Sequence, residues 1–151
     1  MKVEICEYTR QRISDVMEFE RQLRVEEPFY GWDIDEAYQK RVEASFDDPR
    51  FANAVTLLAR EGGKVVGRID GSLIASRFDG SVNGYLDWIC VVKSSRHAGT
   101  AQALLAELRR RMKQAGAAQL IALMAANEEA QRFYRAVEGA SIHDEGIWID
   151  L

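Results

Sequence analysis

The stretch from Tyr85 to Ala115 constrains the fold more than any other part of this 151-residue chain. Its first part, Tyr85 to Val92, is apolar at nearly every position apart from Asp87, which is typical of a strand covered on both faces. A short turn leads into residues 98–115, where apolar side chains recur at helical spacing. A buried strand followed directly by an amphipathic helix predicts a sheet with helices on its faces, which is an α/β fold.

The rest of the chain alternates between helical and strand-like patterns. In chain order these patterns predict a strand at 2–8, helices at 11–23 and 35–46, strands at 54–60, 64–76 and 85–92, a helix at 98–115, a strand at 118–125, a helix at 127–138 and a last strand at 147–151. Asp35 is the expected N-cap of the second helix, and the Gly62-Gly63 pair predicts a hairpin turn. The order β-α-α-β-β-β-α-β-α-β favours a mixed central β-sheet flanked by helices.

Composition narrows the class of protein. No linker-like or repetitive segment interrupts the sequence, so we expect a single domain over 1–151. The formal net charge of -4 argues against nucleic acid as the main partner. No apolar run approaches the roughly 20 residues of a membrane span, and the N-terminus lacks the apolar core of a signal peptide. Cys6 and Cys90 lie in apolar runs without a Cys/His cluster, so we expect no metal site and a cytoplasmic location.

The turn from Arg96 to Ala101 has the composition of a phosphate-binding loop. The first turn of a helix leaves backbone N–H groups without intrahelical partners and carries the positive end of the helix dipole. Small residues at Gly99 and Ala101 would let a phosphate approach the backbone, and Arg96 could add positive charge. An ordinary strand-to-helix turn explains the same residues equally well. The turn matches neither GxGxxG nor the GK[ST] of a Walker A loop.

This loop and the residues after it resemble the GNAT superfamily of N-acetyltransferases. The superfamily signature, (Gln or Arg)-x-x-Gly-x-(Gly or Ala), is met by Arg96, Gly99 and Ala101. Such chains continue with a helix, a buried strand and a helix that opens with Asn and carries a Phe-Tyr pair, here Asn127 and Phe133-Tyr134. The resemblance covers Tyr85 to Gly139, and the earlier elements agree in order only. His97 stands where many members have Gly, Lys93 where many have Pro, and Ala140 where an aromatic residue is common.

The resemblance implies a GNAT-like fold that uses acetyl-CoA as co-substrate. An acetyl group would pass to a primary amine by direct attack, without a metal or a covalent enzyme intermediate. The cofactor arm would bind the backbone of one strand and its phosphates the following loop, which assigns cofactor contacts to Ile89, Cys90, Val91, Val92, Arg96, His97, Ala98, Gly99, Thr100 and Ala101. Asn127 would contact the cofactor as well, although its position is equally that of an N-cap.

Two side chains are candidates for proton transfer. By this resemblance, Tyr134 occupies the family position of a general acid that protonates the departing thiolate. The resemblance also makes Tyr134 a cofactor-binding residue. It also falls on the apolar stripe of its predicted helix and could be a core aromatic residue. Asp87 is the only ionisable group in its strand, where burial would raise its pKa towards that of a base. The alternative is an Asp at an exposed strand end, paired with a basic neighbour.

The acceptor side is less well defined by the sequence. Phe29, Tyr30, Trp32 and Asp33 lie between the first two helices and could cover a small polycationic amine, which would be attracted by the negative field of Glu26, Glu27, Asp35 and Glu36. A surface loop stabilised by its own aromatic residues is an equal alternative. Two further functions stay open: a catalytically silent acyl-CoA-binding or sensing domain, and an acetyltransferase for protein N-termini or lysines. The predicted strand 147–151 could form a sheet edge suited to a homodimer.

Overall fold

The structure, a computed structural model, describes residues 2–28 and 31–151. It forms two compact units, Met1–Ile121 and Ala122–Leu151, which are described separately below. The first contains the sheet and three of the helices, and the second contains one helix and the C-terminal segment. The expectation of a single domain over 1–151 stays a prediction.

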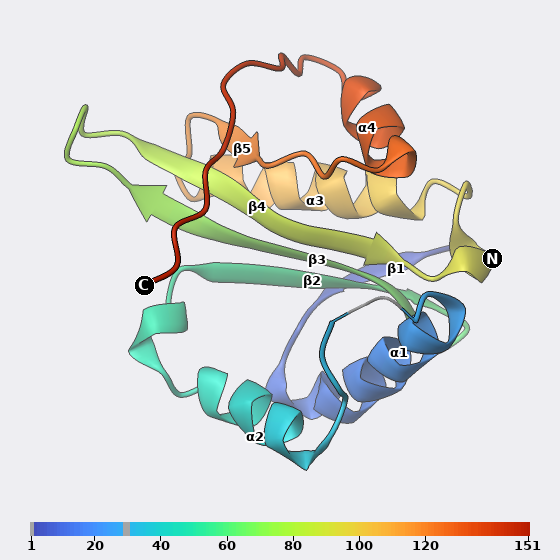
Figure 1. Cartoon of the computed structure of the whole chain (residues 1–151). Helices are drawn as coiled ribbons and strands as arrows, with labels where there is room; N and C mark the ends of the chain where they lie inside the picture. Colours follow the sequence, from blue (N-terminus) through green and yellow to red (C-terminus); the bar gives the residue numbers. More distant parts are fainter. Residues whose placement is uncertain (1, 29–30) are drawn as a thin grey trace. The chain divides into compact units, whose positions relative to one another are not determined.

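The sheet has five strands in the order in which they occur along the chain (Figure 1). They are β1 (Glu4–Glu7), β2 (Ala54–Glu61), β3 (Lys64–Ala75), β4 (Val82–Val91) and β5 (Leu120–Ala122). β1 pairs antiparallel with β2, β2 with β3, and β3 with β4. Beside β5, the Ala118 N–H donates to the Val82 carbonyl at 3.0 Å and the Gly84 N–H to the Gln119 carbonyl at 2.8 Å. Residue numbers rise together in these two bonds, as in parallel pairing, so the expected mixed sheet is confirmed.

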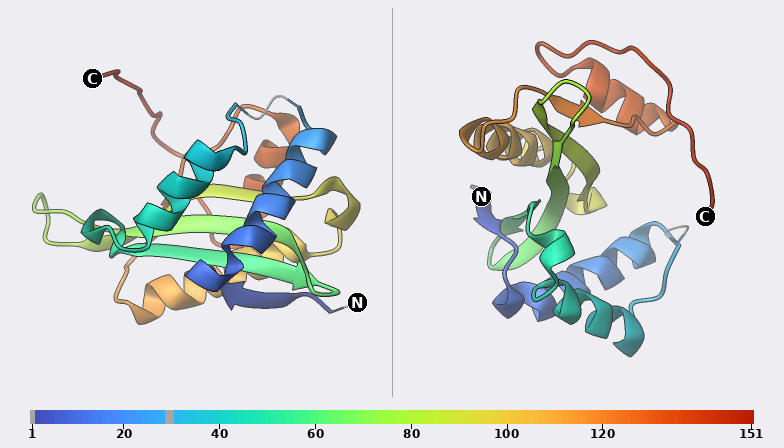
Figure 2. Two further views of the ribbon diagram at one scale, coloured as in Figure 1. Left: turned by 90° about the horizontal axis from the view of Figure 1, so that it is seen from below. Right: turned by 90° about the vertical axis from the view of Figure 1, so that its left-hand side faces the viewer.

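The described residues form four α-helices: α1 (Ile13–Glu26), α2 (Glu36–Ser45), α3 (Thr100–Gln114) and, in the second unit, α4 (Glu128–Arg135). Within the first unit, α1 and α2 cover one face of the sheet and α3 covers the other (Figures 1 and 2). Asp35 caps α2 as predicted, because its Oδ1 accepts the Tyr38 N–H at 2.8 Å. Three short 3-10 helices, at Arg10–Arg12, Pro49–Phe51 and Lys93–Ser95, link the elements.

The two faces of the sheet carry separate apolar layers. The α1 face buries side chains such as Val16, Met17 and Phe19, with Trp88 of β4 packed against them. On the α3 face, a Cβ at Gly71 would lie 2.9 Å from Met112 Cε and 3.0 Å from the Tyr85 carbonyl oxygen, so the glycine lets α3 pack closely against the sheet. This two-sided burial explains why the sequence of β4 is almost continuously apolar.

A β-bulge in β4 lies at Asp87. In the pairing with β3, Asp70 is opposite Trp88 whereas the next residue, Gly71, is opposite Leu86. Asp87 is therefore the extra residue of β4, and the side chains before and after it are out of phase. Leu86 is paired with Gly71 on the α3 face, while Trp88 packs against the α1 layer.

The predicted last strand at 147–151 is wrong. Within the described part of the chain these residues form neither helix nor strand, and Ile147, Trp148, Ile149 and Leu151 are 73–119% exposed. Their alternation of apolar and polar residues fits a strand, but a strand also needs a neighbour to pair its N–H and C=O groups. No such backbone hydrogen bond is present among the described residues of this segment. The edge strand on which we based a homodimer is therefore not formed.

Candidate functional site

The turn between β4 and α3 is held by the last turn of α1. The Val92 N–H donates to the Val66 carbonyl at 2.9 Å, which ends the pairing with β3. The next amide, that of Lys93, donates to Oε2 of Glu26 at 2.6 Å. Arg96 then pairs with both carboxylate oxygens of Glu27, at 3.0 and 2.6 Å. Glu26, the last residue of α1, and Glu27, directly after it, thus fix the path of this turn.

Beyond Arg96, a series of backbone amides points away from any protein acceptor. In this described part of the chain, the N–H groups from His97 to Gln102 have no hydrogen-bond partner, and the ladder of α3 begins with Ala103 donating to the Gly99 carbonyl at 2.9 Å. His97 and Gly99 both have positive φ, 62° and 84°. A Cβ at Gly99 would have no atom within 4 Å, so the space beside this glycine is open.

These amides lie at the positive end of a 15-residue helix. The arrangement fits a phosphate group, as the sequence led us to expect. His97 and Ala98 are exposed, whereas Thr100 is buried.

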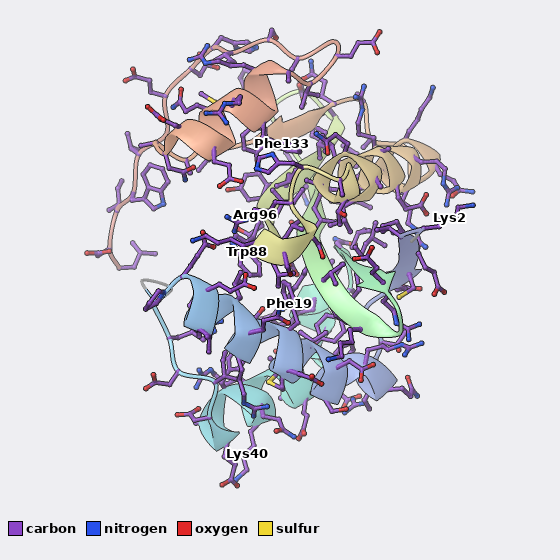
Figure 3. The ribbon with its side chains drawn as sticks, turned by 90° about the vertical axis from the view of Figure 1, so that its right-hand side faces the viewer. Lys2, Phe19, Lys40, Trp88, Arg96 and Phe133 are labelled. Carbon is purple, nitrogen blue, oxygen red and sulfur yellow. The ribbon has the colours of Figure 1, made fainter. Side chains whose placement is uncertain are left out.

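The Arg96 side chain is directed into the protein. Its Nε donates to the Val91 carbonyl at 2.8 Å, and its two terminal nitrogens face Glu27. The side chain is only 14% exposed, and Figure 3 shows it near Trp88, on the side of the sheet that faces α1. The guanidinium charge is therefore balanced by Glu27 within the protein, in contrast to the expectation that it adds positive charge for a phosphate.

Upstream of the turn, β4 contributes the other candidates of the first unit. Cys90, Val91 and Val92 are buried and Ile89 is half-buried. Asp87 lies at the bulge, where its side chain is exposed at the surface. Partial desolvation and the nearby Asp70 carboxylate raise the pKa of Asp87, while Arg68 acts in the opposite direction. The direction of this pKa shift agrees with the prediction from the sequence.

Trp32 belongs to an aromatic cluster on the α1 face. Its ring lies 6.5 Å from that of Trp88 and 6.2 Å from that of Tyr38. The Arg24 guanidinium lies 4.8 Å above the Trp32 ring, and its Nε donates to the Trp32 carbonyl at 2.8 Å. Asp33 is exposed, and Phe29 and Tyr30 lie outside the described residues.

The acidic residues around Trp32 largely have structural partners. Glu26 and Glu27 hold the β4–α3 turn, Asp35 caps α2, and Glu36 pairs with Lys40 at 2.7 Å. Three arginines also lie over the aromatic rings of this face, Arg24 on Trp32, Arg41 on Tyr38 and Arg68 on Trp88. The negative field that the sequence suggested here is therefore mostly neutralised.

A buried charge network under this face was not predicted. Glu20 of α1 is fully buried and binds Arg24 at 2.6 Å and Arg68 at 3.3 Å. Arg68 also pairs with Asp70 at 2.6 Å, and Asp70 accepts the Thr56 hydroxyl at 3.0 Å. The one signal in the sequence is that Glu20 lies three residues from both Met17 and Leu23, on the apolar stripe of its helix.

The second unit contains Asn127 and Tyr134. Asn127 caps α4, because its Oδ1 accepts the Ala130 N–H at 2.8 Å. Tyr134 is half-buried, with its ring 5.3 Å from that of Phe133 in an edge-to-face arrangement. The capping role of Asn127 is confirmed, whereas its cofactor contact and the acid role of Tyr134 stay predictions.

No helix in the described part of the chain is long and apolar enough to cross a membrane.

Comparison with known proteins agrees with this geometry. The structure is similar to an aminoglycoside acetyltransferase, meta-AAC0020, from an uncultured soil metagenomic sample, with a TM-score of 0.81, 12% identity, and 99% of this chain and 96% of that one covered. It is also similar to the ribosomal-protein-alanine N-acetyltransferase of Brucella melitensis biovar Abortus 2308, with a TM-score of 0.76, 17% identity, and 99% and 100% coverage. For AAC(6')-Iy in complex with a CoA bisubstrate analog, the TM-score is 0.77, with 17% identity and 100% and 99% coverage.

At these identities the structural similarities show the fold, and membership of a family follows from the sequence itself. No curated protein sequence matches this chain. The model of the acetyltransferase (GNAT) family matches residues 17–138, which include most of α1, the β4–α3 turn and α4. This chain therefore belongs to the acetyltransferase (GNAT) family, whose members are acetyl-CoA-dependent acyltransferases.

Proposed function

We propose that this protein transfers the acetyl group of acetyl-CoA to a primary amine of a small molecule. The observation that carries the proposal is the series of unpaired amides from His97 to Gln102 at the start of α3. Six donors at the positive end of a helix dipole suit the pyrophosphate of CoA. The backbone of Ile89 to Val92, which leads directly into this turn, would bind the pantetheine arm.

The chemistry needs two proton transfers, one from a side chain of this protein and one to a side chain of this protein. The neutral amine attacks the thioester carbonyl carbon, the C–S bond breaks, and the sulfur leaves with the bonding electrons. Tyr134 would donate its hydroxyl proton to that sulfur, and a base would take the proton that the amine loses. Asp87 is our candidate for the base, because partial desolvation and the nearby Asp70 carboxylate raise its pKa and so make its carboxylate a stronger proton acceptor.

A small amine is the acceptor class that the structural neighbours support best. Two of the three neighbours named above are described as aminoglycoside enzymes or bind an acetylneamine analog. The third is described as acting on a ribosomal protein, which keeps protein N-termini as the second candidate. The acids near Trp32 give a polycationic acceptor little support, since most of them have partners within the protein.

Release of free CoA, followed with a thiol reagent across a panel of amines and peptides, tests the function. Turnover with small amines supports the proposal, whereas turnover with peptides alone favours the protein acetyltransferase. Thermal stabilisation by CoA without turnover on any acceptor would identify a silent acyl-CoA-binding domain instead.

Two variants test the assigned roles. Tyr134→Phe is expected to lower kcat by at least about tenfold without unfolding the protein. Asp87→Asn is expected to remove the acid limb of the pH–rate profile, because a base is active only above its pKa. An unchanged rate for the first variant, or an unchanged pH profile for the second, would rule out the corresponding role.

A further inference from the structure

Glu26 at the end of α1 and Glu27 directly after it make two contacts with the β4–α3 turn, one with its backbone and one with a side chain. The carboxylate of Glu26 accepts the Lys93 amide at 2.6 Å, and that of Glu27 binds the Arg96 guanidinium through both oxygens. The Glu27–Arg96 pair is nearly buried, with side chains 11% and 14% exposed. These contacts join residues that are 67 and 69 positions apart in the sequence.

The two contacts lie at the two ends of the segment Lys93 to Arg96, which directly precedes the unpaired amides. Lys93 opens the short 3-10 helix, and Arg96 immediately follows it and precedes His97, the first of the unpaired amides. Arg96 is tied on its other side as well, because its Nε donates to the Val91 carbonyl at 2.8 Å. The guanidinium therefore connects β4 to α1 and fixes the point from which residues 97–102 begin.

An arrangement of amides binds an anion well only when it is formed before the anion arrives. Each residue that must be ordered on binding subtracts from the affinity. His97 increases this requirement, because its φ of 62° is an unfavourable conformation for a residue with a side chain. Something outside the turn must hold it in this conformation, and the contacts from Glu26 and Glu27 are suitably placed to do so.

We propose that Glu26 and Glu27 are positioning residues for the cofactor, which hold the amides of residues 97–102 in their anion-binding arrangement through Lys93 and Arg96. The inference rests on the proposed function for the identity of the anion, the phosphates of CoA. In this role Arg96 acts through the shape of the turn and its guanidinium makes no phosphate contact.

A double-mutant cycle separates this role from direct phosphate binding by Arg96. The variants are Glu27→Gln, Arg96→Gln and the two combined, with the Kd for CoA measured by calorimetry and kcat and KM measured with acetyl-CoA. We expect each single variant to raise Kd and KM by about tenfold, equivalent to about 1.4 kcal/mol, with kcat within about twofold of its original value. The double variant should bind CoA no more weakly than either single variant, because both remove the same contact.

Glu107→Gln is the matched control. Glu107 loses the same charge in this variant and also pairs with two arginines, Arg110 and Arg111, but farther along α3. Its Kd for CoA should stay within about twofold of the original. The proposal is overturned if Arg96→Gln weakens CoA binding while Glu27→Gln leaves it unchanged or strengthens it, because a released guanidinium would then be contacting the phosphate.

Hydrogen exchange of the free protein gives a readout that does not depend on CoA. Glu26→Ala and Glu27→Gln should each speed exchange of the hydrogen-bonded amides that flank the unpaired series, those of Lys93, Ser95, Arg96 and Ala103, while exchange in the β2–β3 pair is unchanged. Unchanged exchange in the turn would overturn the positioning role even if the protein never bound CoA. Faster exchange in the turn, in a protein that does not bind CoA, would support the clamp and refute the proposed function.

Discussion

Replacing Thr100 by valine is expected to stabilise the protein. Thr100 is the first residue of α3 and is 2% exposed, and its hydroxyl has no hydrogen-bond partner among the described residues. A buried polar group without a partner costs about 1–3 kcal/mol. Valine has nearly the same shape, and the two residues have similar helix propensities, so the substitution removes this cost without creating a cavity.

We expect Thr100→Val to raise the free energy of unfolding by about 1 kcal/mol, at the low end of that range because a hydroxyl can rotate towards a distant acceptor. For a protein of this size the change corresponds to a rise in Tm of about 2–4 °C. Urea denaturation followed by circular dichroism measures the first quantity, and calorimetry measures the second. The m-value should not change, because the same surface is exposed on unfolding.

Thr56→Val is the matched control, with the opposite expected sign. The Thr56 hydroxyl donates to the Asp70 carboxylate at 3.0 Å, so its removal should lower the free energy of unfolding by about 1.5–3 kcal/mol. If Thr100→Val instead lowers stability by an amount similar to Thr56→Val, the Thr100 hydroxyl has a partner and our reasoning about its burial is refuted.

Three further predictions concern other features of the first unit. His97→Gly should raise the free energy of unfolding by about 0.5 kcal/mol and His97→Val should lower it, because the φ of 62° at this residue suits glycine and is least favourable for a β-branched residue. Equal stabilities of the two variants in urea would contradict this. Glu20→Ala, which leaves two buried arginines without their shared carboxylate, should cost about 3–5 kcal/mol, whereas Glu36→Ala, which breaks an exposed pair, should cost less than about 0.5 kcal/mol; similar urea midpoints for the two would show that burial does not matter here. Hydrogen bonds from Arg110 and Arg111 lower the pKa of Glu107 to about 2, so its contribution to stability is present above its unfolded pKa of 4.5 and is lost as the pH falls towards 2; Glu107→Gln should flatten the stability curve in that acid range, and an identical acid limb would disprove the contribution.

The local features of the site could be predicted from the sequence. The apolar run of β4, the spacing of apolar residues in α3 and the caps at Asp35 and Asn127 depend on residues within a few positions of one another. Such patterns are set by helix and strand periodicity and by the orphan amides of a helix start. The amide series after Arg96 follows from them, because any helix that begins on a glycine after a buried strand leaves its first N–H groups open.

The contacts that give Arg96 and Glu27 their roles could not be predicted in the same way. From the sequence, Arg96 is expected to add positive charge for a phosphate, and Glu27 is expected to add to the negative field around the acceptor. They pair across 69 positions, and nothing local to either one indicates the other. Glu20 and Arg68, 48 positions apart, present the same difficulty. The tertiary fold places each charge. It brings the end of α1 against the end of β4, where Glu27 meets Arg96, and one face of α1 against β3, where Glu20 meets Arg68.

The prediction for residues 147–151 was wrong for a related reason. An alternation of apolar and polar residues specifies which side chains share a face, but not whether a neighbouring strand is present to accept the hydrogen bonds. The hairpin of β2 and β3 did not have this problem, because its turn at Gly62-Gly63 brings the partner strand with it.

The bulge at Asp87 affects how β4 would tolerate insertions and deletions. In a regular strand, removing one residue at either end shortens the strand and leaves the remaining side chains on their original faces. Deleting Asp87 would remove the extra residue and make Leu86 and Trp88 neighbours opposite Gly71 and Asp70, in regular pairing with β3, so the side chains on both flanks would keep their present faces. Deleting Ile89 with loss of the bulge would instead put Trp88 opposite Ile69, on the face of Gly71, and take it out of the α1 layer. Asp87, whose side chain is exposed, is therefore a residue that β4 can lose without moving Leu86 or Trp88 to another face.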